Sequence, residues 1–227
     1  LRYDPSIESK LPKKTWKDFE SINESPNIAF IENSICNRLE QKLKTYEGEK
    51  ICIALSGGVD STLVLSLIRK IKPDIDIEAV SIKFADSIDE TTTASNIAKT
   101  FDANHNIVYL ENYLSELPKA ISMTQLPFWD LHWYHVVKKA QTLSKILISG
   151  DGGDELFGGY TFRYDKFLSL TSDNSTPLEK VKIYLECHER DSVPDQENIF
   201  NQKSNFSWNS IYQILLPYFN NKLSRLE

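Results

Sequence analysis

Apolar residues recur along the chain with two different spacings, which together predict helices and strands in alternation. From Asn27 onward, apolar side chains return at every fourth position, which indicates a helix that ends near Gly48. Residues 51–55 (ICIAL) form a short continuous apolar run, as in a strand that is covered on both faces. Similar runs predict three further strands, at residues 77–84, 106–110 and 145–149. Helical spacing predicts further helices at residues 63–71, 89–101, 114–123, 130–143 and 177–190.

Strands that alternate with helices are typical of β-α-β units and a parallel sheet. We therefore predict an α/β fold with a doubly wound, mostly parallel sheet and helices on both faces. In such a sheet, ligands bind beyond the carboxyl ends of the strands, where the strand order reverses. Residues 1–26 are polar, contain three prolines and predict a linker arm. We expect residues 27–190 to form the domain itself, and residues 191–227 an incomplete C-terminal helical part of it.

Composition and charge narrow the class of protein. Of the 227 residues, 41% are hydrophobic and 26% are charged, which is typical of a soluble globular domain and excludes a disordered chain. The formal net charge of −6 provides no basic field for a phosphate backbone, so we expect no nucleic-acid partner. Three scattered cysteines are too few for a disulfide framework, and we expect neither a signal peptide nor a membrane span. These features predict a cytoplasmic protein with reduced thiols.

The segment that follows the first predicted strand, residues 56–61 (SGGVDS), has the features of a phosphate-binding loop. Its glycines permit a tight turn whose N–H groups can face an anion, and the next helix adds its positive N-terminal end. Ser56 and Ser61 can donate hydrogen bonds. Asp60 would repel a polyphosphate unless a cation lay between them, and Mg²⁺ is the natural candidate. The alternative is a plain turn in which a Ser or Asp caps the helix.

A second unusual loop follows the last predicted strand, at residues 149–160 (SGDGGDELFGGY). It holds five glycines and three carboxylates in twelve residues. Carboxylates so close together repel one another, so a cation or hydrogen-bonding partners are needed to hold them. An acidic calcium-type loop is the alternative, although the EF-hand pattern is not met.

These two segments carry a resemblance to a known family. SGGVDS resembles the PP-loop of the N-type ATP pyrophosphatases, whose fold is the adenine nucleotide alpha hydrolase-like type of α/β sheet. SGDGGDELFGGY resembles the signature of the asparagine synthetase branch, and the likeness covers roughly residues 27–165. The resemblance implies cleavage of ATP between the α and β phosphates. It also implies that a carboxylate is activated as an adenylate, which a nitrogen nucleophile then attacks.

The resemblance also implies roles for individual residues. The pyrophosphate-binding loop is matched by Ser56, Gly57, Gly58, Asp60 and Ser61. Positions that contact adenosine are matched by Leu55, Phe84, Ser149 and Gly150. The match of Phe84 depends on the strand register, and the alternative is a core aromatic residue.

Three carboxylates are the catalytic residues that the resemblance implies. Asp60 and Asp154 match the two carboxylates that hold Mg²⁺ on the pyrophosphate. Asp151 matches an acidic position linked to formation of the acyl-adenylate. Glu155 is expected to support the second loop through hydrogen bonds.

The chain departs from the family pattern in several places. In residues 126–135, Pro127 and Asp130 match, but a Ser and a second Pro that help to shape the acceptor pocket do not. His132 and His135 could share a helix face, and we interpret them as packing or hydrogen-bonding residues rather than metal ligands. The downstream segment with the family's catalytic lysine and the N-terminal glutaminase domain are not found, so we expect a piece of a longer synthetase.

The leading hypothesis is ATP-dependent amide-bond formation: a carboxylate, with aspartate the first candidate, is adenylated with release of pyrophosphate and is then attacked by ammonia. ATP and Mg²⁺ are the expected cofactors. The expected partners are the carboxylate, ammonia and a glutaminase domain, upstream in the parent chain or as a separate protein, and a homodimer is left open. One alternative is a related cyclase that uses another amine, as β-lactam synthetases do. Another is a nucleotide-binding module without catalysis.

Overall fold

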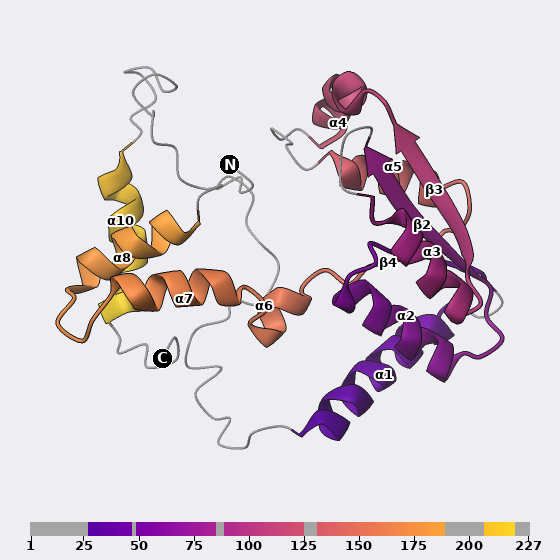
Figure 1. Ribbon diagram of the computed structural model, residues 1–227, viewed down its shortest axis with the longest axis horizontal. Coiled ribbons are helices and arrows are strands. Elements are labelled where there is room, and N and C mark those ends of the chain that lie inside the picture. The colour runs from indigo at the N-terminus through magenta and orange to yellow at the C-terminus, as the bar shows by residue number, and fades with distance from the viewer. Residues whose placement is uncertain (1–26, 47–48, 85–88, 125–130, 189–206, 221–227) are drawn as a thin grey trace. The chain divides into compact units, whose positions relative to one another are not determined.

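The computed structural model describes residues 27–46, 49–84, 89–124, 131–188 and 207–220 (Figure 1). The chain divides into two compact units, residues 1–151 and residues 152–227. The predicted division of the chain at residues 26 and 190 stays a prediction, because both boundaries adjoin residues outside the described ranges. In the described part of the chain, no helix combines the length and the apolar character that a membrane crossing requires.

A four-stranded parallel sheet forms the centre of the first unit (Figure 1). Its strands in chain order are β1 (Ile51–Ala54), β2 (Ile77–Phe84), β3 (Asn104–Leu110) and β4 (Leu147–Ile148). The spatial order is β3-β2-β1-β4, so the chain builds outward from β1 on one side and then returns to its other side. The strand order therefore reverses between β1 and β4, and this reversal is where a doubly wound sheet binds its ligands.

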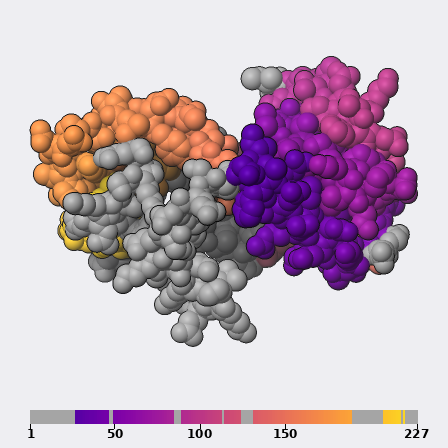
Figure 2. Space-filling model, turned by 90° about the horizontal axis from the view of Figure 1, so that it is seen from below, coloured from indigo at the N-terminus to yellow at the C-terminus, as the bar shows by residue number. Residues whose placement is uncertain are grey.

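Helices cover both faces of this sheet. The first unit contains α1 (Ile28–Lys44), α2 (Val59–Ile71), α3 (Thr91–Thr100), the short 3-10 helix η2 (Tyr113–Glu116), α4 (Leu117–Thr124) and α5 (His132–Ala140). Buried residues of α1, α2 and α3 pack with one face of β1 and β2, whereas α5 packs on the opposite face. Helix α1 lies at the surface of the unit (Figure 2). Leu43 is its one buried residue. The predicted fold class is confirmed.

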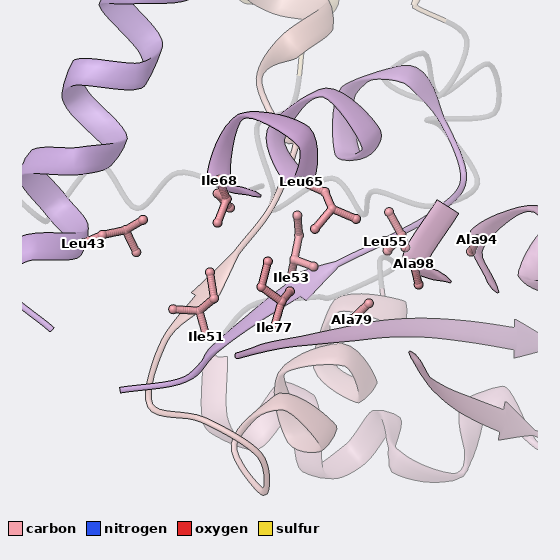
Figure 3. Packing of buried hydrophobic residues seen from close by; sticks show 10 residues of the cluster. All are labelled: Leu43, Ile51, Ile53, Leu55, Leu65, Ile68, Ile77, Ala79, Ala94 and Ala98. Carbon is pink, nitrogen blue, oxygen red and sulfur yellow. The ribbon is translucent and has the colours of Figure 1, made fainter. Parts of the chain in front are cut away.

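The side chains of β1 point alternately to the two faces of the sheet, so the core has two layers. Ile51 and Ile53 meet Leu65 and Ile68 of α2 on one face (Figure 3). Cys52 points to the other face and joins the cluster that contains Val136 and Ala140 of α5. Burial raises the pKa of the Cys52 thiol to about 11, as expected for a structural cysteine. A strand with both faces buried needs a continuous apolar sequence, which is the pattern of residues 51–54.

Most predicted elements of the first unit are confirmed, with shifts at their ends. Strand β2 has the predicted bounds, and α2 begins four residues earlier than predicted because the end of the SGGVDS segment forms its first turn. Helix α1 ends at Lys44, not near Gly48, since the backbone N–H of Thr45 closes its last turn; residues 47–48 lie outside the described ranges. His135, interpreted as a packing or hydrogen-bonding residue, is buried, and its ring meets Tyr134 edge-on at 5.5 Å between centroids.

The second unit is helical in its described part. It contains α6 (Gly153–Phe157), α7 (Thr161–Leu170), α8 (Pro177–Cys187) and α10 (Trp208–Asn220), and α8 packs against both α7 and α10. Helix α8 was predictable from Thr176, whose hydroxyl accepts from the Glu179 N–H in a capping box. Helices α6 and α7 were not predicted, whereas α10 lies in residues 191–227, where a helical part was expected without bounds. Glycines flank the short helix α6, and α7 exposes several of its apolar residues, so neither shows a clear amphipathic period. Helix α10 contains Pro217 in its interior.

Arg69 at the end of α2 joins two connections on the same side of the sheet. Its guanidinium donates to four backbone carbonyls at 2.6–2.9 Å, those of Pro73, Ile75, Phe101 and Asp102. The first two lie between α2 and β2, and the last two lie between α3 and β3. One side chain therefore holds both turns at the amino ends of β2 and β3, on the side of the sheet opposite the loops that follow β1 and β4.

We expect Arg69→Ala to lower the free energy of unfolding of the first unit by about 2–3 kcal/mol, since the carbonyls lose charge-assisted partners. Lys70→Ala is the matched control, because Lys70 is an exposed neighbour with only a surface ion pair to Glu32, and such pairs contribute little. Urea denaturation would measure both. Equal midpoints for the two variants would contradict the role given to Arg69.

Candidate functional site

The first loop begins where β1 leaves the sheet. The Leu55 N–H makes a last hydrogen bond to the Val80 carbonyl at 2.9 Å. Gly57 then adopts φ +82°, a left-handed conformation that glycine tolerates best. A Cβ at Gly57 would lie 3.4 Å from Thr93 Cβ and from the Ala94 nitrogen, so the turn runs close beside α3. The glycine therefore serves both the bend and the close approach.

Two serine hydroxyls hold the two ends of this loop together. The Ser56 N–H donates to Ser61 Oγ at 3.3 Å, and the two hydroxyl oxygens lie 3.2 Å apart. Between them, the Gly58 N–H donates to Ser56 Oγ at 3.2 Å, and Ser61 Oγ donates to the Gly58 carbonyl at 3.3 Å. Ser61 is buried, so its hydroxyl works inside the loop. The loop is thus preorganised by its own side chains.

Helix α2 starts at this loop without a side-chain cap. Its N-cap is Gly58, and no side chain bonds to its first N–H groups there. The alternative of a turn capped by Ser or Asp is therefore not what forms. The exposed first turn presents backbone N–H groups and the positive end of the helix dipole, which together suit an anion. Asp60 lies in that same turn, half-buried, where its charge favours a cation beside the anion.

The second loop meets the first at Gly150. Strand β4 pairs with β1 in register Cys52↔Leu147 and Ile53↔Ile148, so both strands deliver their loops to the same edge. A Cβ at Gly150 would lie only 2.6 Å from the Ser61 nitrogen and 2.7 Å from the Asp60 carbonyl carbon. Backbone thus packs on backbone at the first turn of α2. Two segments separated by some ninety residues of sequence form one structure.

The predicted adenosine residues lie around the same sheet edge. Leu55 is buried at 2% exposure, its N–H is bonded to the Val80 carbonyl and its own carbonyl accepts from the Ser81 hydroxyl, so its contact with adenosine stays a prediction. Ser149 is half-buried, and its hydroxyl accepts from the Asp151 N–H at 3.4 Å. Asp151 itself is exposed. Phe84 is the last residue of β2, in register with Leu110 and half-buried, so its role in binding stays a prediction.

Asp154 and Glu155 belong to the second unit, in the first turn of α6. Left-handed glycines bound this short helix, Gly152 at φ +93° and Gly158 at φ +67°. The Gly159 N–H donates to the Asp154 carbonyl at 3.0 Å, and a Cβ at Gly159 would overlap the Asp154 carboxylate. The lack of a side chain at Gly159 therefore leaves room for the Asp154 carboxylate.

Glu155 supports this segment through a hydrogen bond, as predicted. The Tyr160 hydroxyl donates to Glu155 Oε1 at 2.6 Å, and this bond holds the pKa of Glu155 below its usual range. The Arg163 guanidinium stacks over the Tyr160 ring at 4.5 Å from its centroid. Arg163 was not predicted, because no sequence pattern links a cation to a ring three residues away across a helix start.

Comparison with known proteins identifies the family. The model of the asparagine synthase family matches residues 39–221. The chain belongs to the asparagine synthase family. The match includes both loops, so the two motifs that meet at Gly150 both lie in the asparagine synthase domain.

The curated relatives are longer proteins of the same family. The chain is 28% identical over 188 residues to asparagine synthetase [glutamine-hydrolyzing] 1 of Bacillus subtilis, a match that covers 75% of this chain and 29% of the relative. It is 34% identical over 111 residues to putative asparagine synthetase [glutamine-hydrolyzing] 2 of Methanocaldococcus jannaschii, covering 47% and 22% respectively. The chain thus spans less than a third of the length of either relative.

Solved structures that resemble this asparagine synthase domain include two synthetases of NAD. One is the NH3-dependent NAD synthetase from Campylobacter jejuni, with TM-score 0.45 and 15% identity over 88% of this chain and 95% of that one. The other is the glutamine-dependent NAD+ synthetase from Acinetobacter baumannii in complex with adenosine diphosphate, with TM-score 0.46 and 13% identity over 91% of this chain and 47% of that one.

Gly150→Ala tests the contact between the two loops of the asparagine synthase domain. The added methyl group would overlap the backbone at Asp60 and Ser61, so the first turn of α2 must shift. We expect the affinity for ATP to fall at least about tenfold, because a misplaced anion site loses several directed hydrogen bonds. Calorimetric titration with ATP and Mg²⁺ would measure this loss.

Gly152→Asn is the matched control. Gly152 is also a loop glycine, but nothing lies within 4 Å of the position of its Cβ, and Asn tolerates its left-handed φ of +93°. Thermal unfolding of both variants would separate a local shift of the loop from a general loss of fold. If Gly150→Ala keeps full affinity for ATP, the close contact is not needed for binding.

Proposed function

We propose that this chain is the ATP-binding part of an amide-forming ligase, in which ATP activates a carboxylate as an adenylate and pyrophosphate leaves. In the form of the proposal that is closest to the family's name, aspartate is the carboxylate and ammonia is the nucleophile. One observation carries it: Gly150 of the asparagine synthetase signature packs directly on the uncapped start of α2 that follows the PP-loop. Both motifs of the family thus flank one anion-binding helix end.

The proposed chemistry divides between backbone and side chains. The N–H groups of the first turn of α2 bind the leaving pyrophosphate and stabilise the charge that develops on it. Asp60 and Asp154 provide carboxylate ligands for Mg²⁺, which would neutralise charge on the phosphate oxygens when bound. Asp60 fits this role because a carboxylate in an anion-binding turn needs a cation between itself and the phosphate. The protein forms no covalent bond to the substrate.

The remaining predicted residues orient the reactants. Adenosine is held by Leu55, Phe84, Ser149 and Gly150. Asp151 takes part in formation of the acyl-adenylate. Holding the carboxylate oxygen in line with the α-phosphorus accounts for much of the rate enhancement in such a transfer.

The source of ammonia is the proposed partner. The relatives named above are glutamine-hydrolyzing enzymes, which supports a glutaminase that supplies ammonia to this domain, in the same chain or as a separate protein. The thiols of Cys36 and Cys52 are free, which suits the reducing cytoplasm proposed for the protein. The small-molecule carboxylate is the other partner.

A second candidate retains the ATP chemistry and changes the nucleophile. Residues 126–135 lack the Ser and the second Pro that the family uses to shape its acceptor pocket, and residues 125–130 lie outside the described ranges. A changed acceptor segment favours a carboxylate other than aspartate, and the related cyclases also use an amine other than ammonia.

We expect Asp60→Asn to remove the Mg²⁺ dependence of ATP binding, since an amide oxygen carries no charge for the cation. Calorimetric titration with ATP, in excess Mg²⁺ and in EDTA, measures this directly. For the unchanged protein, the affinity should be at least about tenfold higher with Mg²⁺, while for Asp60→Asn the two titrations should agree within about threefold. Asp74→Asn, an exposed aspartate beyond the far end of α2, is the matched control.

Pyrophosphate release then distinguishes the candidate activities. Release that needs both aspartate and an ammonium salt supports asparagine formation. Release with another carboxylate or amine supports the second candidate, and tight ATP binding with no release under any of these conditions supports a nucleotide-binding module without catalysis. Equal ATP affinity in Mg²⁺ and in EDTA for the unchanged protein would contradict the proposed cation site.

A further inference from the structure

A chain of hydrogen bonds ends at the last peptide group before the first loop. The Ser81 hydroxyl of β2 lies 2.5 Å from the Leu55 carbonyl oxygen and donates to it. Ser81 Oγ also lies 2.7 Å from His105 Nε2 on β3, and His105 Nδ1 lies 2.7 Å from Ser95 Oγ on α3. The residue that follows β1 is thus connected through side chains to β2, β3 and α3.

The geometry determines which ring nitrogen of His105 carries the proton. A serine hydroxyl has one hydrogen. Ser81 donates it to the Leu55 carbonyl oxygen, which can only accept a hydrogen bond. The bond between Ser81 and His105 therefore needs a hydrogen on Nε2. In the neutral ring Nδ1 then has a lone pair, which accepts from the Ser95 hydroxyl. Every polar atom of the ring is satisfied in this one tautomer, and burial lowers the pKa of His105, which favours the neutral ring.

The position of Ser81 argues against a role in packing alone. Ser81 follows Ile77 and Ala79 on the face of β2 that packs against the core, and it is buried at 5% exposure. A buried hydroxyl costs desolvation unless it is bonded, and an apolar pair of similar shape would serve stability about as well. Instead, the chain of hydrogen bonds connects the Leu55 carbonyl, directly before the loop, to Ser95 of α3. Helix α3 lies beside Gly57 of the loop.

We propose that His105 is a positioning residue for nucleotide binding, which acts through Ser81 to hold the Leu55 carbonyl and, with it, the start of the PP-loop. This inference rests on the proposed function of the loop as the ATP site. His105 itself touches no reactant. It fixes the direction in which the chain leaves β1, and therefore where the N–H groups of the loop point.

Two substitutions at His105 separate positioning from packing. His105→Leu keeps much of the volume but has no donor for Ser81, whereas the amide of His105→Gln can donate to Ser81 Oγ. We expect His105→Leu to weaken binding of ATP with Mg²⁺ about tenfold and His105→Gln to recover it to within about threefold, measured by calorimetry on the full chain. Ser81→Ala should match His105→Leu, and the double variant should be no weaker than either, because both remove the same chain of bonds.

Asn106→Ala is the matched control. Asn106 neighbours His105 on β3 and also bonds across to β2, donating to Glu78 Oε2 at 2.8 Å, but it lies on the opposite face of the sheet and its bond does not reach the loop. We expect its ATP affinity to be unchanged. Thermal unfolding of every variant shows whether stability changes together with affinity.

The outcomes separate this inference from the proposed function. If the unchanged chain binds ATP and both His105→Leu and Ser81→Ala bind it equally well, the positioning role is wrong and the proposed function stands. If the unchanged chain binds no ATP, both are overturned. Should His105→Leu fail to fold, Ser81→Ala provides the same test. Nitrogen chemical shifts of the four histidines provide a further check, since a proton on Nδ1 of neutral His105 would overturn the proposal.

Discussion

At Gly150 the backbone that follows β4 lies so close to the peptide between Asp60 and Ser61 that no side chain fits between them. This contact holds two segments that are far apart in sequence against each other beside the start of α2. Any displacement of either loop would change where the first N–H groups of that helix point. Electrostatic stabilisation depends on hydrogen-bond donors that are already in place. The lack of space for a side chain at Gly150 therefore also determines whether these donors keep their positions.

The parallel sheet makes this contact possible. Strand β1 lies between β2 and β4, so its carboxyl end is next to the carboxyl ends of both neighbours, and the strand order reverses beside it. Two apolar layers hold β1 in place, one through Ile51 and Ile53 and one through Cys52. A rigid strand that ends in a glycine turn can then carry a helix end without a side-chain cap. The N–H groups that this helix end leaves unsatisfied are a cost to folding, and in the proposed function they bind the anion.

The sequence predicts the sheet well because the spacing of apolar residues and the composition of each strand are local properties of the chain. The apolar run at 51–55 and the strand at 77–84 need no knowledge of distant contacts. The bounds of α10 within the expected helical part at residues 191–227 were not predicted, because they depend on tertiary packing, such as Phe219 of α10 against Phe167 and Tyr184. In the site, the PP-loop residues were predictable from their motif. The chain from His105 through Ser81 to Leu55 was not, since no spacing in the sequence indicates that these three residues meet.

The central claim is that the first turn of α2 and its loop bind the pyrophosphate part of ATP. The most direct measurement is a titration of the nitrogen-15-labelled chain with pyrophosphate and Mg²⁺, followed through backbone amide signals. The account predicts saturable shifts that are largest at the amides of Gly57, Gly58, Val59, Asp60, Ser61 and Gly150. Saturable binding that leaves those six amides unmoved and shifts signals elsewhere, or no binding at all, would contradict it.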